Sequence, residues 1–172
     1  IVGAIGVFAI IIKYRLELPN IQSMVEDYKP QMATIIYDKN NNVVDTLSVE
    51  SREIAKLENI SPYIKEAFLA IEDKQFYSHH GLNFRGITRA IVTTFLKGRP
   101  TQGGSSITQQ LAKNAFLTPE RTFSRKVKEA ILTYQIERTY TKDEILERYL
   151  NEIYFGSGSY GIRNAAEQYF KK

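Results

Sequence analysis

Apolar residues recur at helical spacing over most of the chain from Glu53 onward. The first stripe, which begins at Ile64, has apolar residues at i, i+3, i+4 and i+7, the one-sided pattern of a helix that faces a core. Two further stripes follow, and no internal repeat or low-complexity tract interrupts the pattern. The three stripes are Ile64, Ala67, Phe68 and Ile71; Val127, Ala130, Ile131 and Tyr134; and Ile145 or Leu146, Tyr149, Leu150 and Ile153. The sequence therefore predicts a mainly α-helical domain at residues 53–172.

Ahead of the helical region the periodicity changes to that of β-strands. Residues 33–37 and 43–49 are rich in β-branched and aromatic residues, and the turn between them contains Asp38 and several asparagines. Asp and Asn side chains bond to the backbone two residues on, so the pattern predicts a hairpin with an Asx turn. We therefore interpret residues 19–52 as a connector and a short hairpin.

Residues 1–12 are uninterrupted apolar residues or glycine. A helix of that length rises about 18 Å, short of the ~30 Å hydrocarbon core, so residues 1–18 are interpreted as part of a transmembrane anchor. A cleaved signal peptide is one alternative, although no small-residue cleavage site follows the run. A core helix is the other, and it would have to be covered on all sides. Lys13 and Arg15 favour the cytoplasm for the end that follows.

Composition limits the class of function. The 172 residues carry a formal net charge of +4, spread along the chain, which favours anionic ligands or surfaces over nucleic acid. With 43% hydrophobic residues the chain has enough apolar material for one domain with its own core. The absence of cysteine excludes a disulfide scaffold and a cysteine-ligated zinc site.

Two acids, Glu72 and Asp73, follow the end of the first helical stripe. Carboxylates in this position are expected at the rim of a core rather than inside it. Partial desolvation at a rim suits a carboxyl group to general base or acid chemistry near neutral pH. The two histidines of the chain, His79 and His80, are too few for a metal site. His79 is instead expected to have a structural role, holding the loop after Glu72 by a hydrogen bond.

A glycine pair, Gly103 and Gly104, precedes the next helical segment. Ser106 and Gln109 have the spacing of a capping box, so a helix is expected to begin there. Its N-terminus would present free backbone N–H groups and a positive dipole end, which suit phosphate or pyrophosphate. The nucleotide P-loop has a lysine directly after its final glycine; this segment lacks one, so an ATPase is not predicted. An ordinary loop and helix cap is the alternative interpretation.

Basic residues gather between Arg121 and Glu129. Arg125, Lys126 and Glu129 are spaced to share one face of a helix, away from the stripe expected to be buried. One interpretation is an exposed ion pair between Arg125 and Glu129, contributing about 0.3–0.5 kcal/mol. The other is an anion-binding face that holds one acid within reach of a basic cluster.

Five short segments between Glu72 and Phe170 match known sequence motifs, in the order in which these motifs occur together. The pattern E-D-x-x-F-x-x-H-x-G is met by Glu72, Asp73, Phe76, His79 and Gly81. The pattern G-x-S-T-I-T-Q-Q is met by Gly103, Ser105, Ile107, Thr108, Gln109 and Gln110, with Ser106 where threonine is usual. R-K-x-x-E is met by Arg125, Lys126 and Glu129, and the last two segments are Tyr149 to Asn151 and Ala165 to Phe170. From about Ile36 onward, the chain thus resembles the peptidoglycan glycosyltransferase family, the polymerase domain of class A penicillin-binding proteins and of monofunctional transglycosylases.

The resemblance implies a lysozyme-like helical fold on the extracytoplasmic face of a bacterial membrane, held by a single transmembrane segment. This orientation is opposite to the one that Lys13 and Arg15 favour, so the dominant positive charges are expected on the cytoplasmic flank of the anchor. It also implies polymerisation of lipid II by β-1,4 bonds, with inversion and release of undecaprenyl pyrophosphate. Glu72 would be the general base, and Glu129 would act at the pyrophosphate, where a divalent metal, Mg or Mn, could bind. The residues implied to contact substrate are Asp73, Phe76, Ser105, Gln110, Lys113, Arg121, Arg125 and Lys126.

The implied partners are lipid II, the growing glycan chain, the lipid bilayer and, in a full-length protein, a C-terminal transpeptidase domain. Two alternative functions stay open. A lysozyme-like glycan-cleaving enzyme would use Glu72 as a general acid and would need no cations for a pyrophosphate. A catalytically inert, membrane-anchored wall-binding module would keep its role without Glu72.

Overall fold

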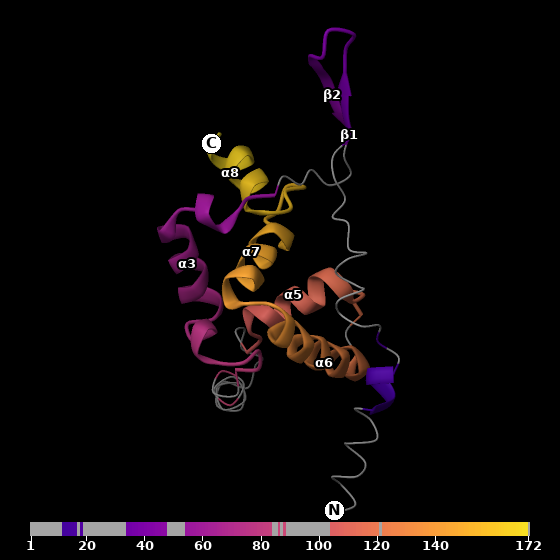
Figure 1. The fold of residues 1–172 in the computed structure, drawn as a ribbon, viewed down its shortest axis with the longest axis vertical. Helices are drawn as coiled ribbons and strands as arrows, with labels where there is room; N and C mark the ends of the chain where they lie inside the picture. Colours follow the sequence, from indigo (N-terminus) through magenta and orange to yellow (C-terminus); the bar gives the residue numbers. More distant parts are fainter. Residues whose placement is uncertain are drawn as a thin grey trace, which may run out of the picture.

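The computed structural model describes residues 12–16, 18, 34–47, 54–83, 86, 88, 104–120 and 122–171. They form one β-hairpin and a group of helices, which confirms the mainly helical class (Figure 1). No helix within these ranges has the length and apolar character needed to cross a membrane. Most of the anchor predicted at residues 1–18 lies outside the described residues, as does the connector up to residue 33.

The named elements are, in chain order, β1 (Thr34–Tyr37), β2 (Val43–Leu47), the 3-10 turn η1 (Leu57–Asn59), α3 (Pro62–Glu72), the 3-10 turn η2 (Phe76–Ser78), α5 (Ile107–Phe116), α6 (Phe123–Thr139), α7 (Lys142–Glu152) and α8 (Ile162–Phe170).

The predicted hairpin is confirmed, with β1 and β2 paired antiparallel and Thr34 opposite Leu47. Asp38 forms its turn, because Oδ1 accepts hydrogen bonds from the backbone N–H groups of Asn40 (2.7 Å) and Asn42 (2.9 Å). The Asn42 side chain donates to the other oxygen, and with the backbone bonds it holds the pKa of Asp38 below its usual value. Figure 1 shows the hairpin projecting away from the helices.

The core lies where α5 packs against both α6 and α7 (Figure 1). Each helix contributes apolar residues three or four positions apart, so that they share one side of the helix. Burial of each such side chain contributes about 1.5–3 kcal/mol. The buried residues are Ile107 and Leu111 of α5, Leu132 and Ile136 of α6, and Ile145, Leu146, Tyr149 and Leu150 of α7. The stripe predicted at 145–153 is therefore confirmed.

The face predicted to be buried on α6 is wrong. Tyr134 is 59% exposed, and the buried face instead carries Glu129, Leu132, Thr133 and Ile136. A carboxylate enters the core on this face because side chains of α5 and α6 supply hydrogen bonds to it. A prediction from hydrophobicity alone therefore misses a carboxylate whose burial is balanced by hydrogen bonds.

The prediction that the stripe of α3 faces the core is also wrong for most of its members. Ile71 is 80% exposed, and Ile64 and Ala67 are exposed as well. Among the described residues, Phe68 and Leu69 are the side chains of α3 that pack on the core. The ring of Phe68 meets Tyr149 edge-on at 6.4 Å between centroids, which contributes to this packing.

Side chains of α7 hold the extended segment that precedes η1. Asn151 accepts a hydrogen bond from the backbone N–H of Ala55 (2.8 Å) and donates one to its carbonyl (2.9 Å). Glu147 accepts from the backbone N–H of Leu57 at 2.7 Å. These bonds replace the partners that a neighbouring strand would supply.

The turn predicted at 156–161 is confirmed. The Phe155 N–H donates to the Ser159 carbonyl at 2.9 Å, and the Gly161 N–H donates to the Ile153 carbonyl at 2.9 Å. Gly161 has a φ of +80°, and a Cβ there would lie 2.9 Å from the carbonyl oxygen of Asn151. Glycine thus allows α8 to start directly against the end of α7.

Gly81 is required by both conformation and space. Its φ is +89°, and a Cβ would lie 2.7 Å from Thr133 Cγ2 and 2.9 Å from Glu137 Cγ. Gly81→Ala should therefore lower the free energy of unfolding by roughly 2–4 kcal/mol, combining backbone strain with overpacking. Gly158→Ala is the matched control: its φ is +77°, but a Cβ meets nothing within 4 Å, so a loss of about 1 kcal/mol is expected. Urea unfolding measures both, and equal losses would contradict the steric part of the argument.

Candidate active site

The two acids at the end of α3 have different surroundings. Glu72 is partly exposed, and its Oε2 accepts a hydrogen bond from Gln110 Nε2 of α5 at 2.7 Å. Asp73 is only 4% exposed and caps the C-terminus of α3 with its backbone N–H. The expectation of a rim position therefore holds for Glu72 and is wrong for Asp73.

Asp73 ties three segments together from inside the protein. Its carboxylate accepts hydrogen bonds from His79 Nε2 (2.7 Å), Asn83 Nδ2 (3.2 Å) and the backbone N–H of Ile107 (3.3 Å). Ile107 is the first residue of α5, so the carboxylate also lies at the positive end of that helix dipole. These donors satisfy the buried charge, and this burial leaves Asp73 little surface for the substrate contact predicted from the sequence.

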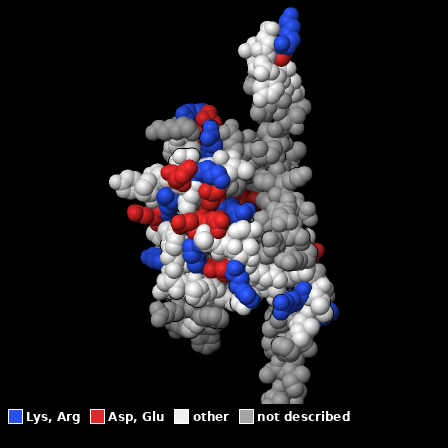
Figure 2. Space-filling model, in the orientation of Figure 1, with Lys and Arg blue, Asp and Glu red and all other residues white. Residues whose placement is uncertain are grey.

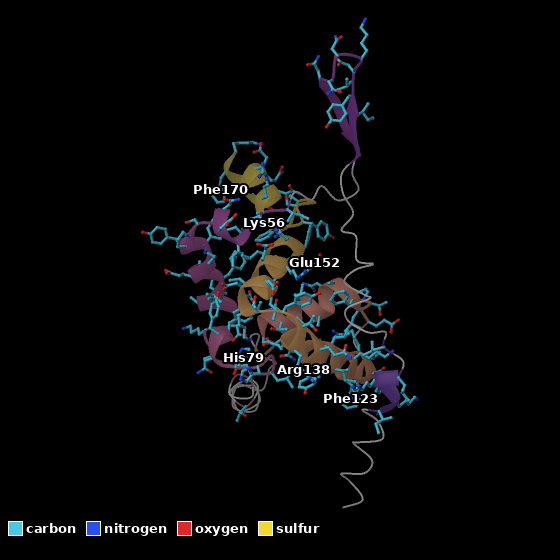
Figure 3. The ribbon with its side chains drawn as sticks, viewed as in Figure 1. Lys56, His79, Phe123, Arg138, Glu152 and Phe170 are labelled. Carbon is cyan, nitrogen blue, oxygen red and sulfur yellow. The ribbon has the colours of Figure 1, made fainter. Side chains whose placement is uncertain are left out.

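His79 has the structural role expected from the sequence. Its Nδ1 accepts a hydrogen bond from the Gly81 N–H at 3.2 Å, so the ring proton is on Nε2, where it faces Asp73. Figure 3 shows His79 in the loop that follows α3. The bond pair fixes the loop between Glu72 and Gly81.

The predicted capping box opens α5. Gln109 N–H donates to Ser106 Oγ (3.2 Å), and the Ser106 N–H donates to Gln109 Oε1 (3.0 Å). Ser106 Oγ also donates to the Gly81 carbonyl, which joins the cap to the loop after α3. Gly104 is described, whereas Gly103 lies outside the described residues.

Two adjacent glutamines of α5 connect the two candidate acids. Gln110 donates to Glu72, and Gln109 Nε2 donates to Oε1 of Glu129 on α6 at 3.3 Å. The first turns of α5 thus lie between Glu72 and Glu129, which brings the first three motifs into one site. Tyr149 adds a long hydrogen bond to Gln110 Oε1 (3.4 Å), and burial, followed by the charge of Glu72, raises its pKa.

Glu129 is the centre of the basic cluster and is only 1% exposed. Arg125 Nη1 donates to its Oε2 at 3.1 Å, and Lys126 Nζ donates to its Oε1. Lys126 also donates to Ser105 Oγ at 3.1 Å, although its side chain is 49% exposed. The pair of Arg125 and Glu129 is therefore no exposed ion pair, and the two cations leave the cluster with an excess positive charge.

The side chains around Glu129 do not form a suitable set of ligands for a divalent metal. Each carboxylate oxygen already accepts a charge-assisted hydrogen bond from a cation. Magnesium and manganese need several oxygen ligands, and their charge would lie beside two positive side chains. Within the described ranges, no group of three or more His, Asp or Glu residues is arranged to hold a metal. This surface suits an anion.

The other predicted site residues have varied positions. Phe76 is buried in the core with Lys142 Nζ 4.4 Å from its ring centroid, which gives it a packing role; its predicted substrate contact stays a prediction. Lys113 is exposed on α5, one turn beyond Gln109 and Gln110 on the same face. Arg121 lies outside the described residues. Figure 2 shows cationic and anionic side chains interspersed on the visible face of the helices.

Sequence reasoning missed the contacts that Gln109 and Tyr149 make to this site. Apart from their places in the motifs, the sequence indicates Gln109 as a capping residue and Tyr149 as a core residue. Either glutamate or glutamine can fill this capping position. The choice of glutamine, which has an NH2 group to donate, is the sequence signal that could have indicated a further contact of Gln109.

Comparison with known proteins was consistent with this geometry. Residues 40–172 match the family model described as Transglycosylase. The chain is 49% identical over 137 residues to penicillin-binding protein 1F of Bacillus subtilis (strain 168), an alignment that covers 80% of this chain and 19% of that protein. It is 42% identical over 168 residues to penicillin-binding protein 1A of Aquifex aeolicus (strain VF5), covering 98% of this chain and 23% of that protein. The same protein of Rickettsia bellii (strain RML369-C) is 42% identical over 175 residues, covering 100% and 22%. The chain thus spans about a fifth of the length of these curated relatives.

Asp73→Asn tests the buried acid. The amide keeps one acceptor oxygen but turns an NH2 group toward a donor, so we expect a loss of about 2–4 kcal/mol in the free energy of unfolding. Asp143→Asn is the control, because the exposed Asp143 accepts a hydrogen bond from Tyr77 and should lose less than about 1 kcal/mol. Equal losses in urea unfolding would show that burial does not decide the outcome.

Proposed function

The chain belongs to the transglycosylase family as the peptidoglycan glycosyltransferase domain of class A penicillin-binding proteins, and from this premise we propose that it polymerises lipid II into glycan strands. Each cycle forms one β-1,4 bond with inversion and releases undecaprenyl pyrophosphate. One observation carries the assignment of roles: adjacent glutamines of α5 bond to Glu72 on one side and to the cationic Glu129 cluster on the other.

Glu72 is the general base in this proposal. One carboxylate oxygen accepts from Gln110, which orients the group and leaves the second oxygen to accept a proton. The proton comes from the 4-hydroxyl of the acceptor sugar. That oxygen attacks the anomeric carbon of the growing chain, and the bond from this carbon to the pyrophosphate breaks.

Arg125 and Lys126 stabilise the leaving pyrophosphate. The leaving group departs as an anion, so it needs positive charge more than a strong acid. Lys126 is exposed enough to reach a ligand, and Arg125 Nε is a buried donor without a hydrogen-bond partner among the described residues. The exposed Lys113 of α5 adds positive charge for the phosphates, and Ser105 lies beside the Lys126 ammonium. The role of Arg121 stays a prediction. The proposal assigns no step to a metal, because cations occupy both oxygens of Glu129.

Lipid II is held in a bilayer, so the domain is anchored at the cytoplasmic membrane with its site on the extracytoplasmic face, in a lysozyme-like fold. The full-length protein carries a C-terminal transpeptidase domain that cross-links the strands. The relatives' name and length support this setting.

Glu72→Gln tests the assignment of the base. Glutamine keeps the shape and the contact with Gln110 but accepts no proton, so strand formation from labelled lipid II in detergent should fall roughly 10²–10⁴-fold. Glu66→Gln removes an exposed charge from the same helix and should leave the rate unchanged. Polymer formation by Glu72→Gln at the wild-type rate would exclude this base.

Lys126→Ala separates polymerisation from glycan cleavage. Loss of a cation at the leaving group should slow polymerisation roughly 10²–10³-fold. Lys128→Ala is the matched control on the same helix, since the Lys128 ammonium lies 5.6 Å from the ring centroid of Tyr14 instead. A lysozyme-like enzyme would cut purified glycan strands equally well with either variant, and an inert wall-binding module would neither polymerise nor cut.

A further inference from the structure

Gln109 makes a contact that helix capping does not require. Its side chain is buried, with Oε1 accepting from the Ser106 N–H at 3.0 Å and Nε2 donating to Glu129 Oε1 at 3.3 Å. The cap fixes the orientation of the amide, because a flipped amide would turn Nε2 toward a backbone N–H and Oε1 toward a carboxylate. The capping box therefore aims the NH2 group at Glu129.

A second capping box in the same chain provides an internal comparison. In α7, Glu144 fills the position that Gln109 fills in α5, and its carboxylate accepts from the Thr141 N–H at 2.8 Å. Glutamate caps as well as glutamine and also favours the positive end of the helix dipole. The first turn of α7 carries two acids, and that of α5 carries none. Capping alone does not account for glutamine at 109, whereas an amide donor facing the buried Glu129 does.

Gln109 also differs from the other donors to Glu129. Arg125 and Lys126 precede Glu129 on α6, so their bonds do not link this acid to another helix. Among the described donors, Gln109 is the one that joins the Glu129 carboxylate to α5. The next residue of α5, Gln110, bonds to Glu72.

From this arrangement we infer that Gln109 is a positioning residue, which sets Glu129 and its two cations at a fixed place relative to Glu72. It touches no substrate and acts through Glu129. Because Lys126 bonds to the same oxygen of Glu129 and to Ser105, a displaced carboxylate displaces the ammonium too. The inference rests on the proposed function, in which these cations stabilise the leaving pyrophosphate.

Gln109→Glu is the decisive variant. Glutamate retains the capping bond but places a carboxylate oxygen against Glu129, so the link between α5 and α6 is lost and repulsion replaces it. Since a misplacement of about 1 Å can cost on the order of 10²-fold in rate, we expect kcat for polymerisation of lipid II to fall about 10²-fold with KM little changed. Glu144→Gln makes the reverse exchange in the cap of α7, away from the site, and should leave both constants unchanged.

The outcomes separate the two proposals. Polymerisation by wild type and Glu144→Gln, with at least a tenfold loss of kcat per folded molecule in Gln109→Glu, supports the inference. A smaller loss, or a loss confined to KM, overturns it and leaves the proposed function standing. If Gln109→Glu does not fold, Gln109→Met decides by the same criteria, since methionine fills the space and lacks the donor. A folded wild type that forms no polymer overturns the proposed function and the inference with it.

Discussion

The first two turns of α5 supply the hydrogen-bond donors on which the rest of the site depends. The backbone N–H of Ile107 bonds to Asp73, the amide of Gln109 to Glu129, and the amide of Gln110 to Glu72. Three carboxylates from two other helical segments are thus placed by three residues within one four-residue stretch of a single helix. The capping box has consequences beyond helix stability, because it fixes where this helix begins and which way Gln109 points.

Two of these carboxylates are buried, and burial makes their placement demanding. An ionised carboxylate in a protein interior is tolerated only with several donors, and loss of one donor exposes the full cost of desolvation. Asp73 meets this demand with a histidine, an asparagine and a helix N-terminus, whereas Glu129 meets it with two cations and an amide. Neutral donors lock the loop after α3, and charged donors leave a cationic surface.

Local signals in the sequence predicted the fold well where bonding is local. The Asx turn at Asp38, the cap at Ser106 and the stripe of α7 depend on residues within a few positions of one another, and all are confirmed. The predictions of the buried faces of α3 and α6 were wrong because a hydrophobicity scale treats each side chain without its bonding partners. Glu129 enters the core through a bond from Gln109, twenty residues away in sequence, which no periodicity contains. The motifs indicated several of the residues that gather at the site, but not that Asp73 and Phe76 would be buried in the protein interior.

The contact between α7 and residues 54–57 has a mechanical consequence. The Asn151 side chain is hydrogen-bonded to both the N–H and the carbonyl of Ala55, and Glu147 accepts a hydrogen bond from the N–H of Leu57, two positions later. A pull on the chain from the N-terminal side of Ala55 therefore acts on the bonds to Asn151 first and on the bond to Glu147 next. Tension from that side is transmitted into α7, whose buried apolar face packs against α5, the helix that bonds to the candidate acids.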